Sequence, residues 1–182
     1  MEILINTKEK IVNLGLELIQ TRGINGFSFA DIAKVIDIKK ASIHYYFPSK
    51  TDLIEAVLEK YSTNFFEALE QSTASTLKAK LEYYTSLYRM NLIEGRICRC
   101  SDLAMDTYNL NDSINNKVGD FFQKNISWLE KQFTEYKSSQ KASEFFAGIQ
   151  GAQLISRNQK RIDYFDEVIT KSIDDLLLSV EK

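Results

Sequence analysis

The sequence is poor in the residues that break helices. Its 182 positions include one proline and seven glycines, and both residues weaken a helix when they lie in its interior. Apolar residues recur with the 3.6-residue period of helices along nearly the whole chain. With 44% apolar residues, the chain can also bury a sizeable core. These features predict an all-α protein of about nine helices.

Cysteine and histidine are scarce as well. The chain has two cysteines, Cys98 and Cys100, and one histidine, His44. Two cysteines are too few for a disulfide scaffold and fit a reducing cytosol, so we expect a cytoplasmic protein. These three residues do not supply the four ligands of a structural zinc site from one subunit. We therefore expect no metal and no other cofactor.

Several functional classes lack their sequence signals. No apolar run approaches the length of a membrane span, and the first residues lack the basic start of a secretory signal, so we expect no membrane association. No glycine-rich phosphate loop occurs, and the scattered carboxylates form no convincing acid–base pair. The sequence therefore predicts a protein that is not an enzyme.

Charge of neither sign is in large excess. The net charge is −2, and residues 1–60 hold eight Lys or Arg and eight Asp or Glu. Binding to DNA depends on where basic side chains gather on the surface more than on the net charge. The composition thus leaves DNA open as a partner.

The stretch 28–50 contains two short amphipathic segments joined by a tight turn. Ser28, followed three residues later by Asp31, is typical of a helix start. Ile36-Asp37-Ile38 interrupts the apolar pattern, and Asp tolerates the left-handed backbone of a sharp turn. The second segment ends before Pro48. It presents side chains that reach phosphates and base edges, namely Lys39, Lys40, Ser42, His44, Tyr45 and Tyr46.

Residues 38–53 read IKKASIHYYFPSKTDL and resemble the helix-turn-helix signature of the tetracycline-repressor (TetR) family; the resemblance extends from about Thr7 to Leu58. It implies an N-terminal three-helix DNA-binding domain at 1–48 and a double-stranded DNA operator. One such unit touches few bases, so we expect a homodimer on a palindromic operator. The exposed array and the resemblance together give the candidate DNA-binding residues as Ser28, Lys39, Lys40, Ala41, Ser42, His44, Tyr45, Tyr46 and Lys50.

Residues 49–182 are expected to form a helical effector-binding and dimerisation domain, with a connector helix at 49–72. Further helices are predicted at about 77–93, 101–108, 113–136, 142–158 and 161–180, with a polar turn at 137–141. The resemblance implies that the last two helices form the dimer interface. Ordinary packing within one chain is the alternative explanation for their apolar faces.

Two groups of residues in this second domain are candidate sensors. Met105, Tyr108, Phe122 and Trp128 carry apolar surface that could line an effector pocket, although aromatic residues at helical spacing are more often plain core. The segment GRICRC at 95–100 places Cys98 and Cys100 beside arginines, which favour the reactive thiolate. It is similar to a family branch with electrophile-responsive and acrylate-responsive repressors. Buried, inert cysteines are the alternative.

Taken together, the sequence predicts a ligand- or redox-responsive transcriptional regulator that acts as a repressor on a palindromic operator. Its effector would be an unknown small molecule or electrophile. The alternative is a DNA-binding regulator that has no small-molecule effector and is controlled by a protein partner. An α-helical carrier of lipid-like ligands is a third possibility, and it would show no salt-sensitive DNA affinity.

Overall fold

The computed structural model describes residues 6–134 and 139–180, and within these ranges all regular secondary structure is helical. The all-α prediction is therefore confirmed. Nine α-helices and one short 3-10 helix (η1) occur in the described ranges: α1 Thr7–Arg22, α2 Phe29–Val35, α3 Lys40–Tyr46, α4 Lys50–Glu70, α5 Leu77–Ile93, α6 Arg99–Ala104, η1 Thr107–Asn109, α7 Asp112–Phe133, α8 Ser139–Gln159 and α9 Ile162–Val180.

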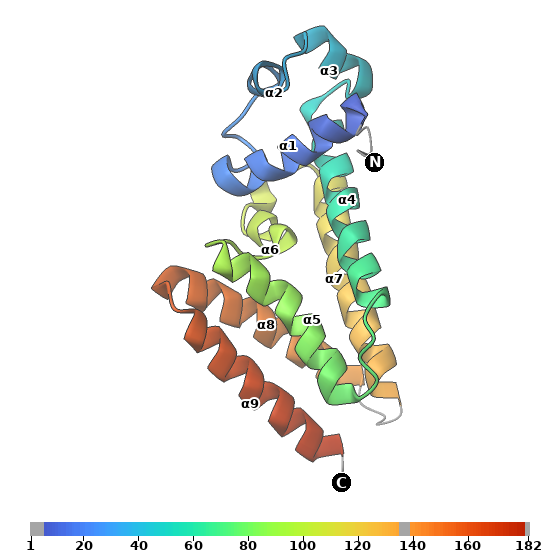
Figure 1. The fold of residues 1–182 in the computed structure, drawn as a ribbon, viewed down its shortest axis with the longest axis vertical. Helices are drawn as coiled ribbons and strands as arrows, with labels where there is room; N and C mark the ends of the chain where they lie inside the picture. The colour runs from blue at the N-terminus through green and yellow to red at the C-terminus, as the bar shows by residue number, and fades with distance from the viewer. Residues whose placement is uncertain (1–5, 135–138, 181–182) are drawn as a thin grey trace.

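The molecule is elongated, with the first three helices gathered at one end (Figure 1). Helices α4 and α7 run side by side along the long axis and pack on each other. Helix α5 packs against α8 and α9, and α9 also lies against α8. The short helix α6 lies directly below α1, between the first three helices and the rest of the chain (Figure 1).

Two capping boxes fix the starts of α2 and α4. The backbone N–H of Ser28 donates to Asp31 Oδ2 at 2.7 Å, and that of Ser49 donates to Asp52 Oδ2 at 2.7 Å. Each serine side chain accepts in turn from the backbone N–H of its aspartate. Hydrogen bonds from the serine side chains, followed by those from the backbone, lower the pKa of both carboxyls. The helix start predicted at Ser28 and the start of the connector helix predicted at residue 49 are confirmed.

Some predicted helix bounds differ from the structure. The helix expected at 101–108 instead begins at Arg99, ends at Ala104 and is followed by η1. Helix α8 begins at Ser139, so the last part of the polar turn expected at 137–141 is helical. Polar residues such as these tolerate a helical first turn, and periodicity alone locates a helix end poorly. Residues 135–138 of these predicted elements lie outside the described residues.

One continuous cluster of buried apolar side chains extends from α1 to α9. At the contact between α1 and α4, a Cβ placed on Gly15 would lie 3.1 Å from Val57 Cγ2, so the two helices approach closely there. A polar network lies inside the same core: Tyr84 and Tyr88 donate to Asn125 Oδ1 at 2.8 and 2.7 Å. Because all three side chains are fully buried, this network links α5 to α7 where water is excluded.

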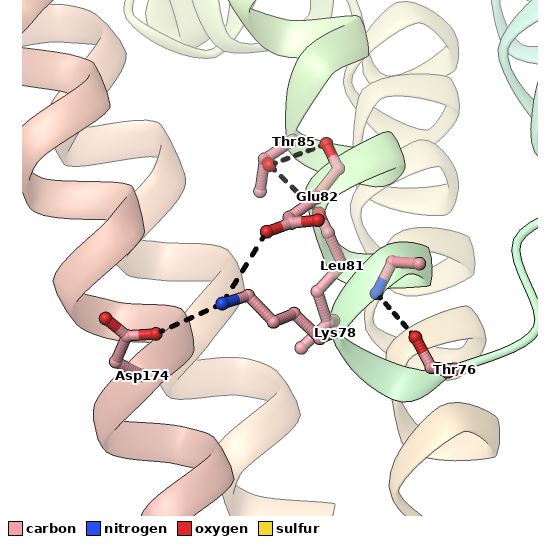
Figure 2. A network of polar contacts seen from close by, with 7 residues as sticks. Thr76, Lys78, Leu81, Glu82, Thr85 and Asp174 are labelled. Carbon is pink, nitrogen blue, oxygen red and sulfur yellow. Dashed lines mark hydrogen bonds and ion pairs between the residues drawn. The ribbon is translucent and has the colours of Figure 1, made fainter.

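Ion pairs join α5 to α9 at the surface. Lys78 lies between Glu82 on its own helix and Asp174 on α9, with nitrogen–oxygen distances of 4.0 and 3.8 Å (Figure 2). Farther along α5, Arg89 makes a two-pronged pair with Asp166 at 2.6 and 2.8 Å. The bidentate geometry makes the second pair the stronger one.

No described helix is both long and apolar enough to cross a membrane.

Candidate nucleic-acid interface and cysteine site

The turn between α2 and α3 has the geometry of a sharp helix-turn-helix corner. Asp37 has a φ of +55°, a left-handed conformation that Asp adopts more readily than most residues. The backbone N–H of Ile38 donates to Ala33 O at 3.0 Å, which closes the turn. The left-handed turn expected at Asp37 is therefore confirmed.

Helix α3 is held by its apolar side. Ile43 is completely buried, and Phe47, which ends the helix, is 3% exposed. Both residues belong to the core cluster that includes Ile11 of α1 and Leu53 of α4. A helix of seven residues is not stable alone in water, so this packing fixes its orientation.

The opposite side of α3 faces solvent. Tyr45 is 83% exposed, and its ring makes an edge contact with that of Tyr46 at a centroid distance of 5.1 Å. The half-buried side chains are those of Ser42 and Tyr46. The exposed ones are Lys39, Lys40, Ala41, His44 and Tyr45.

Three of the candidate DNA-binding side chains already have protein partners. The ammonium of Lys50 donates to Phe27 O at 2.5 Å and lies 4.3 Å from the centroid of the Phe27 ring. Burial lowers the pKa of Lys50. The hydroxyl of Ser28 donates to Asp31 Oδ2 at 2.7 Å. His44 Nδ1 lies 3.3 Å from Pro48 O. Lys50 thus ties the start of α4 to the loop before α2.

The two cysteines lie in the interior beside α4. Cys98 is completely buried and Cys100 is 1% exposed. The hydroxyl of Tyr61 on α4 donates to Cys98 Sγ at 3.4 Å. The backbone N–H of Cys98 donates to Oε1 of Gln153 on α8 at 3.0 Å. The thiol of Cys98 is therefore hydrogen-bonded directly to α4, the helix that follows the helix-turn-helix.

The surroundings of the two thiols shift their pKa values in opposite directions. Burial, the largest effect, raises the pKa of Cys98, but hydrogen bonds from Cys100, Tyr61 and Ser101 outweigh it and lower the pKa to about 6. Burial raises the pKa of Cys100. Sequence reasoning attributed a lowered pKa to the neighbouring arginines; for Cys98 the main cause is instead hydrogen bonding, which only the tertiary structure reveals.

The six candidate sensor residues do not line a common cavity. Met105 and Tyr108 are exposed, Tyr108 completely. The ring of Trp128 stacks on Tyr84 at 5.0 Å with an interplanar angle of 9°, and Phe122 contacts Phe146 at 5.7 Å. Met105 and Tyr108 thus lie on the surface, Cys98 and Cys100 are buried at α6, and Phe122 and Trp128 pack along α7.

Two clefts of the described residues lie away from these side chains. One, of about 200 Å³, lies between α5 and α9 over buried Phe165, Ile169 and Ile173, next to the ion pairs of Lys78 shown in Figure 2. Another, of about 310 Å³, lies between α8 and α9. Sequence reasoning missed the first cleft and also missed Tyr61 as a partner of Cys98. Neither the cleft nor the contact between Tyr61 and Cys98 produces a local sequence pattern, because each brings together residues that are far apart in the chain.

The described residues contain no group of three or more His, Cys, Asp or Glu side chains placed to hold a metal ion. The sequence places its sole histidine, His44, on α3, whereas the cysteines lie at the start of α6. The guanidinium of Arg99, which stands between the two cysteines in the sequence, lies 4.7 Å from the centroid of the Tyr61 ring.

The helix-turn-helix region and the whole fold both have known relatives. A family model described as bacterial regulatory proteins of the tetR family matches residues 11–57. The negative transcriptional regulator IcaR of the biofilm operon icaADBC from Staphylococcus aureus is 42% identical over 48 residues, 26% of this chain and 26% of IcaR. Curated relatives are matched over about a third of their length or less.

Solved structures extend the similarity beyond the first helices. The crystal structure of a TetR transcriptional regulator from Legionella pneumophila shares 31% identity, covers 97% of this chain and 99% of its own, and has a TM-score of 0.87. The reduced form of E. coli NemR shares the fold at 19% identity and a TM-score of 0.79, covering 92% of this chain and 95% of its own. On the strength of the nearly complete match at 31% identity, the chain belongs to the TetR family of bacterial transcriptional regulators.

Proposed function

We propose that this TetR-family regulator is a homodimeric repressor that binds a palindromic operator and releases it when Cys98 is modified. The observation that carries the DNA-binding part is the two-sided character of α3. Its apolar side is fixed by Ile43 and Phe47, while Lys40 and Tyr45 extend into solvent. A short helix held in this way is suited to enter a major groove. IcaR, which matches over 48 residues, is a negative transcriptional regulator.

In this proposal the candidate DNA-binding side chains have different roles. Lys39 and Lys40 are exposed on the array and neutralise phosphates, which makes the affinity depend on salt. Tyr45 and His44 contact base edges or the sugar-phosphate backbone beside them. Lys50 acts indirectly, because its ammonium holds the Phe27 carbonyl and so positions α2.

An exposed stripe of small and apolar residues on α8 supports the proposed dimer. Apart from the backbone of α8 itself, a Cβ placed on Gly148 or Gly151 would meet no described atom within 4 Å, and Leu154 and Ile155 are 46% and 38% exposed. Ala147 is exposed on the same stripe. Small residues allow two helices to approach closely, and apolar side chains around them gain by burial. We propose that this stripe meets its copy across a two-fold axis.

The contact between Tyr61 and Cys98 supports the proposed thiol response. When an activated alkene reacts, the Cys98 thiolate forms the new carbon–sulfur bond, and the neighbouring carbon takes a proton from water. The product is a thioether that can no longer hold a negative charge, and its added bulk does not fit a completely buried site. Because Tyr61 lies on α4, displacement of Cys98 shifts the helix that begins immediately after the helix-turn-helix. Because α4 follows the helix-turn-helix directly, we propose that residues 1–48 form the DNA-binding domain and residues 49–182 the effector-binding and dimerisation domain.

A regulator without a small-molecule effector is the second candidate. The packing among α4, α5 and α7 favours it, because Tyr84, Tyr88 and Phe121 are fully buried there and Trp128 stacks on Tyr84. Such a filled interior leaves control to a protein partner. Modification of the purified protein distinguishes the two, because only the first candidate loses DNA affinity after alkylation of Cys98.

Selection of bound sequences from a random DNA pool tests the main proposal. We expect inverted half-sites whose centres lie about one helical turn, ~34–36 Å, or a multiple of it apart. Lys40→Ala should weaken binding to all sequences and reduce the slope of log affinity against log salt by about 1. Lys171→Ala, an exposed lysine of α9, is the matched control and should bind as the parent does. Recovery of unpaired half-sites by a monomeric protein contradicts the proposal.

A further inference from the structure

Ala41 lies on the outward side of α3. In an α-helix each residue is turned by ~100° from the one before it, so Ala41 and Tyr45, which stand two positions before and two after the buried Ile43, both point almost directly away from that residue. Tyr45 is 83% exposed, and Ala41 is exposed as well. Helices α2 and α3 form the outer end of the molecule (Figure 1). The methyl group of Ala41 therefore faces outward from that end.

The larger side chains around Ala41 leave its methyl group accessible. The ring of His44 contacts that of Phe29 at a centroid distance of 5.0 Å, and the ring of Tyr45 contacts that of Tyr46 at 5.1 Å. Both side chains thus have contacts within the three-helix region, and Ala41 stays exposed with them in place. A partner that approaches α3 from outside can therefore touch this methyl group.

The position of Ala41 along the helix also points to bases. Ala41 is the second residue of α3. When the second helix of a helix-turn-helix lies in the major groove, its N-terminal residues contact base edges. An alanine side chain has no hydrogen-bonding group, so it distinguishes base pairs by apolar contact alone. The C5-methyl group of thymine is the apolar group that base edges present in the major groove, and Ala41 is therefore matched in chemistry to a thymine.

We infer that Ala41 contacts the C5-methyl group of a thymine at one position of each operator half-site and so selects that base. This role rests on the proposed function, because it requires α3 to lie in the major groove. It differs from the role of Lys39 and Lys40, whose phosphate contacts carry no sequence information. Burial of one methyl group changes an affinity by about 4-fold, so the two half-sites of a dimer together contribute ~15-fold.

Replacement of thymine by deoxyuridine tests the contact, because deoxyuridine pairs with adenine in the same way and lacks only the C5-methyl group. The selected operator is synthesised with deoxyuridine at each thymine in turn, and binding of the full chain is measured by fluorescence anisotropy at constant salt. We expect one sensitive thymine in each half-site, with an affinity about 4-fold lower for one replacement and ~15-fold lower for both. A cytosine there should also bind weakly, and 5-methylcytosine should recover part of the loss because it restores the methyl group.

Variants assign the effect to Ala41. Ala41→Gly removes the methyl group from the protein and should bind the thymine and deoxyuridine operators equally. Ala30→Gly is the matched control, because Ala30 is likewise exposed and is the second residue of its own helix, α2; it should keep the full preference for thymine. If circular dichroism shows that Ala41→Gly does not fold, Ala41→Ser takes its place. It keeps the Cβ atom but sets a hydroxyl against the thymine methyl group, and should weaken the preference.

Two results contradict the role inferred for Ala41: no thymine of the selected operator responds to deoxyuridine, or the Ala41 variant prefers thymine as strongly as the parent does. The second result indicates readout by DNA shape or by another side chain, and loss of the preference in Tyr45→Ala would identify that side chain as Tyr45. In both cases the proposed function stands, because the parent has bound an operator. Failure of the parent to select any DNA refutes the proposed function and this role together, and it is seen before deoxyuridine is used.

Discussion

The hydrogen bond between Tyr61 and Cys98 makes a sharp prediction about thiol reactivity. Tyr61→Phe removes the hydroxyl that donates to Cys98 Sγ at 3.4 Å and leaves the ring in place. A hydrogen bond to a charged group contributes roughly 1.5–3 kcal/mol, which corresponds to about 1–2 in pKa. The pKa of Cys98, about 6 in the parent, should therefore rise in the variant toward roughly 7–8.

The consequence appears near neutral pH. With a pKa of about 6, roughly nine tenths of Cys98 is thiolate at pH 7, and this fraction falls to between about a half and a tenth in the variant. Because the thiolate is the nucleophile, the rate of alkylation by iodoacetamide at pH 7 should drop about 2–10-fold. Near pH 9 both proteins are largely ionised at Cys98, and the difference should disappear.

The assay is the pH dependence of the alkylation rate, followed by mass spectrometry in a Cys100→Ser background that keeps a hydroxyl beside Cys98. Tyr83→Phe is the matched control, because the Tyr83 hydroxyl donates from α5 to the Ala68 carbonyl of α4 without contacting a thiol. The control should follow the parent. If parent and Tyr61→Phe share one inflection near the ordinary cysteine pKa, the thiol reacts only after local opening, and our account of its acidity is wrong.

The lowered pKa of Cys98 also makes the stability of the fold depend on pH. A thiol whose pKa is lower in the folded state than in the unfolded chain stabilises the fold above the unfolded pKa, and this contribution is lost as pH falls through the folded value. Cys98 is such a group. The stability difference between the parent and Tyr61→Phe should accordingly be larger at pH 9 than at pH 5, as measured by chemical denaturation at the two pH values.

Three further predictions concern the turn, the core and the exposed helix. Asp37→Val places a β-branched residue at a φ of +55° and should lower the free energy of unfolding by about 1–3 kcal/mol, whereas Asp37→Gly should not; urea titration measures both. Asn125→Leu leaves the buried hydroxyls of Tyr84 and Tyr88 without their acceptor and should cost about 1–3 kcal/mol for each group left unpaired, seen as a lower thermal midpoint. Tyr45→Ala should leave that midpoint unchanged, since Tyr45 is 83% exposed, yet weaken operator binding in fluorescence anisotropy; an unchanged affinity would remove Tyr45 from the interface.

Local sequence signals predicted the starts of α2 and α4 correctly. The serine–aspartate pairs at Ser28 and Ser49 specify capping boxes because the interacting groups are three residues apart. Asp37 specified the left-handed turn for a similar reason. Helix ends without such groups were displaced by a few residues, as at the end of α6, because no local interaction distinguishes one turn of a helix from the next.

The candidate effector residues show the limit of this kind of inference. Met105 and Trp128 were both candidates because they carry apolar surface, but the first is exposed and the second stacks on Tyr84. Periodicity states that a side chain lies on a face and does not state what covers that face. The stacking of Trp128 on Tyr84 and the hydrogen bonds from Tyr84 and Tyr88 to Asn125 join residues that are far apart in the chain, so periodicity does not reveal them.

The sequence by itself determined the helical class, the capped starts of α2 and α4, the turn at Asp37 and the outward side of α3, because each depends on groups within a few residues of one another. The tertiary structure alone decided that Tyr61 donates to Cys98, that Lys50 holds the Phe27 carbonyl and that Arg89 pairs with Asp166. These partners are between 23 and 77 residues apart in the chain. Burial and hydrogen-bond geometry between such distant groups follow from how the helices pack, which no local pattern encodes.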